Sequence, residues 1–208
     1  MNVWSRRRWV PALLAAASGF VPLKAAQGQT RVVPQIGLYV PATSFGAVTA
    51  DGVDGAVELG KKESTRAYGL GLEWGGGGFL GLRTNLAYAT SSDVPISGVG
   101  CTVCSSRSTM LAATAGLVVR PLRLLFIEPY LIGGMGLKRY DFSRADFGEI
   151  LVDDRNVRAW HLGVGGELDL GPLSGVVEIS DYISDRDSQV PGHRLHDFIV
   201  SVGIGIGG

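Results

Sequence analysis

The sequence lacks any uninterrupted apolar run of about 18 residues or more, although its mean hydropathy is positive at +0.22. Because a membrane-spanning helix needs about 20 consecutive apolar residues, we exclude a helical membrane protein. The sequence also lacks a basic excess, with 19 Lys and Arg against 19 Asp and Glu. A nucleic-acid partner requires a strongly basic face, so none is expected.

Cysteine is nearly absent. The two that occur, Cys101 and Cys104, lie in a stretch rich in Gly and Ser. A thioredoxin-like redox site would need βαβ surroundings and a zinc site would need further ligands nearby, and the sequence shows neither. In an exported protein the pair meets an oxidising compartment, so we expect a local disulfide that holds a loop.

The N-terminus carries the parts of a secretory signal peptide. Three arginines precede an apolar stretch from Trp9 to Leu23, and small residues follow up to Gly28. We expect cleavage after Gly28, which makes residues 1–28 the signal peptide and residues 29–208 one domain with 15 basic and 19 acidic residues. The same start resembles a twin-arginine export signal, but an ordinary basic segment is the simpler interpretation.

Glycine, in contrast, is abundant at 31 residues, and it alternates with bulky apolar residues. The stretch from Glu63 to Ala89 reads as two strands of period two around a turn at Gly75 to Gly78. Large apolar residues share one face of this hairpin, and small or charged residues share the other: Tyr68, Leu70, Leu72, Trp74, Leu80, Leu82, Leu86 and Tyr88 against Gly69, Gly71, Glu73, Gly81, Arg83, Asn85 and Ala87. Such strands suit a lipid-exposed barrel, because a bilayer tolerates no open sheet edge.

Eight alternating segments follow one another along the chain, separated alternately by long and short connections. They are Val32 to Val40, Thr65 to Gly75, Phe79 to Thr90, Arg107 to Arg120, Leu124 to Tyr140, Val157 to Leu170, Gly175 to Ser184 and Leu195 to Ile206. Short turns on one side and long loops on the other are typical of outer-membrane barrels. The pattern predicts an all-β fold, an eight-stranded antiparallel up-and-down transmembrane β-barrel, with both of its termini on the periplasmic side.

Aromatic residues on the outward face gather toward the ends of the strands. Five of them mark the expected edges of the apolar band: Tyr68, Tyr88, Trp160 and Phe198 toward the long loops, and Trp74 beside a short turn. We interpret them as two aromatic girdles at the membrane interfaces. The competing interpretation is that these residues simply favour strands.

Polar residues are predicted to fill the inside of the barrel. The expected network comprises Glu73, Arg83, Glu128, Lys138, His161, Glu167 and Glu178, and Glu73 and Arg83 are its best candidate ion pair because they flank one turn. Eight strands enclose an interior that side chains fill, so we expect no wide pore. His161 is expected to be a hydrogen-bonded lumen residue, and we predict no catalytic, metal or cofactor site.

The chain resembles the small eight-stranded outer-membrane barrels, the broad family of opacity and attachment-type proteins. The resemblance rests on residues 34–40 (PQIGLYV), residues 129–136 (PYLIGGMG) and the order of the eight strands. It implies outer-membrane lipids and the barrel assembly machinery as partners, together with a surface ligand of unknown identity. Such barrels usually end on an aromatic residue, whereas this chain ends in two glycines.

The leading functional hypothesis is a non-enzymatic barrel that presents four external loops for envelope structure or surface interaction. One alternative is an enzyme that deacylates or acylates outer-membrane lipid, in which Asp181 or Ser184 approaches His196 at the outer rim. Another alternative is a soluble, lipocalin-like barrel with its apolar face turned inward around a ligand.

Overall fold

The computed structural model describes residues 30–49, 56–75, 78–98, 101–122, 124, 126–144, 155–171, 173–185 and 194–207. The predicted signal peptide lies outside these ranges. The described residues form ten strands: β1 Thr30–Pro41, β2 Gly46–Thr49, β3 Ala56–Leu59, β4 Thr65–Trp74, β5 Leu80–Gly98, β6 Cys101–Val119, β7 Ile127–Arg144, β8 Arg155–Asp169, β9 Leu173–Asp185 and β10 Arg194–Ile206. In these ranges no helix is long and apolar enough to cross a bilayer.

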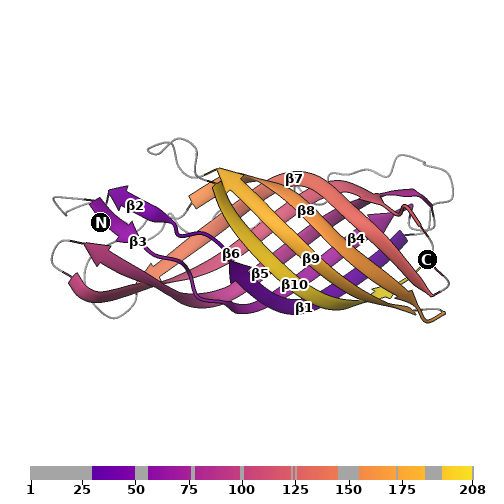
Figure 1. The fold of residues 1–208 in the computed structure, drawn as a ribbon, viewed down its shortest axis with the longest axis horizontal. Coiled ribbons are helices and arrows are strands. Elements are labelled where there is room, and N and C mark those ends of the chain that lie inside the picture. The colour runs from indigo at the N-terminus through magenta and orange to yellow at the C-terminus, as the bar shows by residue number, and fades with distance from the viewer. Residues whose placement is uncertain are drawn as a thin grey trace, which may run out of the picture.

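Eight of these strands, β1 and β4 to β10, close into one antiparallel barrel (Figure 1). Each strand pairs with the next of the eight, β1 pairs with β10, and the pairing of β5 with β6 completes the ring. Closure leaves these eight strands without a free edge, as a bilayer requires. The predicted eight-stranded up-and-down barrel is confirmed.

The barrel has two distinct ends. The short turns β4–β5, β6–β7 and β8–β9 lie at the inner end, where β1 begins, because Thr30 pairs with Trp74, the last residue of β4. The C-terminus lies at the same end (Figure 1). The long connections lie at the opposite, outer end.

The strands continue past their predicted limits at the outer end. β5 and β6 are each 19 residues long, and a further hairpin, β2–β3, pairs with the end of β5 through Leu59 and Ile96. We predicted loops over residues 41–64 and 91–106, and that expectation was wrong where β2 and β3 lie in the first range and where β5 and β6 continue through the second. A register shift between Ala89 and Ser92 breaks the period-two pattern, and beyond it both sheet faces are outside the expected apolar band, so alternation no longer marks a strand.

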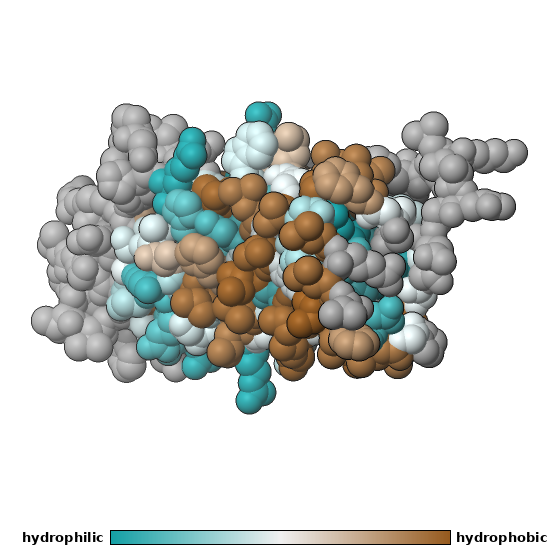
Figure 2. Space-filling view, turned by 45° about the vertical axis from the view of Figure 1, so that its right-hand side comes forward, coloured by the Kyte–Doolittle hydropathy of each residue, from teal (hydrophilic) through white to brown (hydrophobic). Residues whose placement is uncertain are grey.

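The strands alternate between an apolar outer face and a tightly packed interior. In β1, Ile36 and Leu38 are more than half exposed, whereas Val33 and Tyr39 are almost fully buried. A similar alternation is seen in the other barrel strands where their side chains are described, and Figure 2 shows the resulting apolar band on the barrel wall, bordered by hydrophilic residues. The buried charged side chains therefore lie in the interior together with small and apolar residues, and the large exposed apolar side chains lie on the outer wall, the reverse of a water-soluble barrel.

Candidate functional site

Ion pairs fill the lumen in three layers. The inner layer, nearest the short turns, joins two arginines to two glutamates. Arg31 donates hydrogen bonds to Glu167 and to Ser174. Arg120 Nη2 lies 2.5 Å from Glu73 Oε1, and both of these side chains are buried. Each arginine thus has a carboxylate partner, as a buried charge requires.

Glu178 is the centre of the middle layer. Its Oε2 lies 3.0 Å from Arg83 Nη1 and accepts a hydrogen bond of 2.9 Å from the Tyr130 hydroxyl. Its Oε1 accepts a hydrogen bond of 2.7 Å from Ser180. Gln35 Nε2, at 3.4 Å, adds a longer contact to Oε2. Four neighbours therefore hold this carboxylate, and its removal would leave Arg83 as an unpaired buried cation.

His161 lies beside the middle layer with both ring nitrogens in contact with polar groups. Nε2 lies 3.0 Å from Ser180 Oγ, and Nδ1 lies 3.2 Å from Thr114 Oγ1. Its ring stacks on that of Tyr182 with centroids 4.5 Å apart. These contacts make His161 a packed, hydrogen-bonded residue of the lumen.

The outer layer is built around Asp197. Lys138 Nζ lies 2.5 Å from Asp197 Oδ2, and the hydroxyls of Tyr39 and Tyr140 donate hydrogen bonds to the same carboxylate. Lys138 also donates a hydrogen bond of 2.9 Å to the backbone carbonyl of Tyr182. Around this layer the lumen is lined with alanine and aromatic residues, so it is more apolar than the inner layer.

The β3–β4 connection covers the outer layer with a buried lysine. Lys62 Nζ lies 4.6 Å from the centre of the Tyr39 ring, and Lys62 is only 2% exposed. Within the described part of the chain this amine has no hydrogen-bond partner. Burial lowers the pKa of Lys62 from 10.5 to about 8, although the negative charge of Asp197 acts in the opposite direction and raises it.

The lumen also contains one described void of about 10 Å³, room for about one water molecule. Polar groups of Gln35, Glu178, Ser180 and Ser201 line it. A single water bound there would be held by several partners, which is the usual setting of a structural water.

The expected pair of Glu73 with Arg83 does not form. The two residues are register neighbours on β4 and β5, but Glu73 pairs with Arg120 and Arg83 pairs with Glu178 across the lumen. In so narrow a barrel, a long side chain reaches the opposite wall as easily as its neighbour. Glu128 is also less involved than expected, since it is half-buried near the start of β7 and has no ion pair among the described residues.

The sequence pattern missed three members of these layers. Arg31 lies one residue before the predicted first segment, whereas Arg120 and Asp197 lie inside the predicted segments Arg107 to Arg120 and Leu195 to Ile206. The period-two rule places Arg120 and Asp197 on the inward face without any change of limits, and it places Arg31 there once the first segment is extended by one residue. The signal was present in the alternation, but these three residues were not included in the predicted network.

The five outward aromatics lie on the barrel wall as the alternation predicts. Tyr68, Tyr88, Trp74 and Trp160 are each 37–57% exposed, and Phe198 is partly exposed. Tyr68 and Tyr88 are direct register neighbours on β4 and β5. Their role as membrane girdles stays a prediction.

The outer rim contains a second polar contact, on the outward face. His196 Nδ1 lies 2.7 Å from Asp181 Oδ2, and the His196 ring stacks with that of Phe198. Ser184 does not join this pair, because its side chain is buried on the inward face of β9. The residues considered for a nucleophile, base and acid are therefore divided between the two faces of the wall.

Two other sequence expectations concern possible covalent and metal sites. The side chains of Cys101 and Cys104 lie outside the described residues, so their disulfide stays a prediction. Among the described side chains, no three His, Cys, Asp or Glu residues lie close enough to hold a metal ion.

Comparison with known proteins gives matches in fold. No protein-family model and no curated protein matches the chain. The outer membrane protein OprG from Pseudomonas aeruginosa is 16% identical, with a TM-score of 0.56, over 87% of this chain and 96% of that one. Neisserial surface protein A is 12% identical, with a TM-score of 0.56, over 86% and 99%. A major outer membrane protein from Thermus thermophilus is 15% identical, with a TM-score of 0.51, over 88% and 100%.

At these identities the likeness concerns the fold. It agrees with the closed eight-stranded ring of this chain. The chain therefore folds as a small eight-stranded outer-membrane β-barrel.

Proposed function

We propose that this barrel is a non-enzymatic protein of the outer membrane whose lumen is closed to solutes and whose outer end presents a surface for interaction. The observation that supports closure is the layered lumen, in which side chains of Arg83, Glu178, Lys138 and Asp197 meet across the interior at 2.5–3.0 Å. A solute would have to break these buried ion pairs to pass, which is strongly unfavourable.

Presentation at the outer end follows from the long strands. A membrane strand needs about 9–11 residues, whereas β5 and β6 have 19 each. The extra length, together with the β2–β3 hairpin, forms a sheet that projects beyond the barrel at the outer end (Figure 1). Outer-membrane lipids and the assembly machinery are the partners of the barrel itself, and the projecting sheet with its loops would contact the surface ligand.

Three measurements test this proposal. The purified chain should migrate faster on a gel when unboiled than when boiled, as a folded membrane barrel does, and it should need detergent or lipid to stay dispersed. In planar bilayers it should give no steady conductance. Stable, open channels would contradict the closed lumen, and a monomer dissolved in plain buffer would contradict the membrane barrel and favour the lipocalin-like alternative.

The lipid-modifying alternative depends on the His196 and Asp181 contact at the outward rim. A histidine oriented by a carboxylate resembles part of a hydrolytic site, but Ser184, the hydroxyl considered as its nucleophile, is on the other side of the wall. A lipid A deacylation assay should show no turnover by the intact protein. Turnover that His196→Ala abolishes would replace our proposal.

A further inference from the structure

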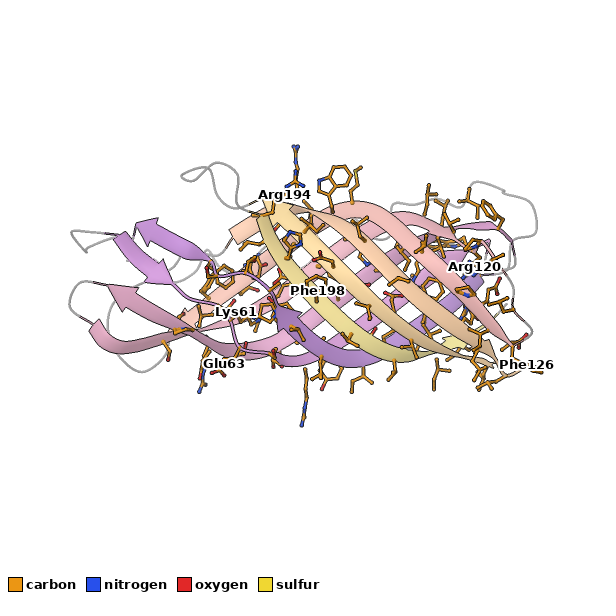
Figure 3. The ribbon with its side chains drawn as sticks, in the orientation of Figure 1. Lys61, Glu63, Arg120, Phe126, Arg194 and Phe198 are labelled. Atoms are coloured by element: carbon orange, nitrogen blue, oxygen red, sulfur yellow. The ribbon has the colours of Figure 1, made fainter. Side chains whose placement is uncertain are left out.

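The three short turns at the inner end carry large, exposed apolar side chains where turns usually carry polar residues. Together they form what we name the apolar collar: Phe79, Leu122, Leu124, Phe126, Leu170 and Leu173, each 45–69% exposed. Figure 3 places Phe126, the most exposed of them, at the tip of the inner end. A soluble surface rarely concentrates apolar groups in this way.

Hydrogen bonds within and between the turns pair several of the collar's described backbone groups. The Arg120 amide donates to the carbonyl of Phe79 at 2.9 Å, which joins the β4–β5 turn to the end of β6. The Asp169 amide donates to the carbonyl of Phe126 at 3.2 Å, which joins the β6–β7 turn to the end of β8. Leu124 and Ile127 exchange a reciprocal pair. Paired backbone groups are the condition for placing a segment in hydrocarbon, because no water is available there.

Two charged side chains flank the described parts of the collar, and one of them is withdrawn from its surface. Arg120 directly precedes the β6–β7 turn, yet it is only 4% exposed and reaches Glu73 inside the lumen. Asp169 is exposed and accepts a hydrogen bond of 2.9 Å from the Gly171 amide. Arg123 lies outside the described residues. The exposed surface of the turns, as far as the structure describes it, is thus mainly apolar, in continuity with the lipid-facing wall.

The length of the wall indicates what covers the collar. Exposed Arg66 and Arg158 lie two residues beyond Tyr68 and Trp160 and mark the outer limit of the apolar band. From Trp160 to Leu168, the last lipid-facing residue of β8, the strand rises about 19 Å at 3.3 Å per residue and a 45° tilt. The apolar band of such barrels is about 25 Å tall. On β8 about 6 Å of that height lies beyond Leu168, and the β8–β9 turn at the inner end is placed to supply it.

We propose that the apolar collar is immersed in the inner leaflet of the bilayer, so that the short turns are part of the membrane-embedded surface and do not project into the periplasm. This inference rests on the proposed membrane location. Lipid is the fitting occupant because the collar continues the lipid-facing wall and shares its chemistry. Coverage by a second copy or by another protein is an outcome that the test distinguishes.

Nitroxide labelling of single cysteines tests the proposal directly. In a Cys101→Ser, Cys104→Ser background, Phe126→Cys and Leu122→Cys are labelled and the barrel is reconstituted in phosphatidylcholine vesicles. Leu131→Cys, on the lipid-facing wall of β7, is the lipid reference, and Arg66→Cys is the interface reference. The ratio of collisions with dissolved oxygen to collisions with a water-soluble nickel chelate is measured at each position.

We expect the labels at positions 122 and 126 to favour oxygen severalfold over the level at position 66 and to approach the level at position 131. Nickel access equal to that at position 66 would overturn the proposal. Shielding of the labels from both reagents would also overturn the proposal, because it would mean that protein covers the collar. If this shielding disappeared when the barrel was diluted with lipid, the covering protein would be a second copy of the chain.

Bilayer thickness provides an independent measurement. In vesicles of 12-carbon lipids the hydrocarbon layer is too thin to cover both the wall and the collar, so nickel access at position 126 should rise. In 18-carbon lipids the layer is thicker and nickel access should fall. Unchanged access in both lipids would contradict immersion. Because folding of the unlabelled barrel is measured separately by its migration on a gel, a water-exposed collar in a folded barrel overturns this inference and leaves the proposed function intact.

Discussion

Tyr130 and Gly165 are register neighbours on β7 and β8, and the tyrosine ring occupies the space that a side chain at position 165 would need. A Cβ added to Gly165 would lie 2.3 Å from Tyr130 Cζ. Only glycine therefore lets Tyr130 lie flat against the wall, from where its hydroxyl reaches Glu178 at 2.9 Å. A missing side chain on one strand thus positions the central ion pair of the lumen.

Gly165→Ala should lower the free energy of unfolding by about 1–3 kcal/mol, because Tyr130 must move and its hydrogen bond to Glu178 is strained or lost. Urea unfolding in lipid vesicles, followed by tryptophan fluorescence, measures the change. Gly166→Ala is the matched control, since its Cβ would meet only Ile127, at 3.8 Å, and should change stability by less than about 0.5 kcal/mol. Equal effects of the two variants would refute the packing argument.

Glu178→Gln should be more damaging, with a loss of about 3–5 kcal/mol, because it leaves the buried guanidinium of Arg83 without its carboxylate. Glu128→Gln removes the same charge from a half-buried position with no described ion pair and should have little effect. The comparison uses the same unfolding measurement. If both variants lost the same stability, net charge and not the specific pair would be responsible.

Much of the barrel was predictable because lipid imposes a strict period of two on each strand. The face assignments of Leu131, Trp160 and Val200 follow from that period and agree with their exposure. The partners inside the lumen were not predictable from the same rule. Arg83 could face Glu73 or Glu178, and the choice depends on how side chains fill the interior across the barrel, which spacing along one strand does not encode.

The strands at the outer end were not predicted, for a related reason. Beyond Ala89 there is a register shift, and the sequence no longer alternates bulky apolar with small residues, so the extended β5 and β6 read as loops. Lys62 was missed as well, because the predicted loop gave no reason to expect a buried lysine in it. Sequence patterning thus describes the part of the chain that lipid constrains.

The stability of the β3–β4 connection around the buried Lys62 should depend on pH. Its pKa falls from 10.5 to about 8 on burial, so the folded state disfavours the charged amine. The stability of the β3–β4 connection should therefore rise as pH increases from about 8 to 10.5 and should be lowest below pH 8, where the amine is charged in both states. Hydrogen exchange of the Gly60 and Glu63 amides, corrected for intrinsic rates, should slow over this range.

Lys62→Met should abolish that pH dependence, whereas Lys61→Met, at an exposed neighbour, should preserve it. The Gly60 amide donates a hydrogen bond to the Pro95 carbonyl of β5, and the Glu63 amide donates one to the Asp93 carbonyl of β5. Their exchange therefore reports on the β3–β4 connection itself. A pH dependence that survives in Lys62→Met would assign it to another group.

Replacing residues 91–107 by a two-residue turn should leave the barrel folded but should loosen the β3–β4 connection over its outer end. The remaining parts of β5 and β6 keep their register from Ala89 with Met110 to Leu80 with Val119, so the ring stays closed and the gel migration of a folded barrel should persist. The acceptors at Asp93 and Pro95 are lost, so the amides of Gly60 and Glu63 should exchange at least tenfold faster, because each loses a hydrogen bond of about 1 kcal/mol and the packing around it. Loss of the folded migration would show that the projecting sheet supports the barrel, whereas unchanged exchange would show that the cover is held by something other than β5.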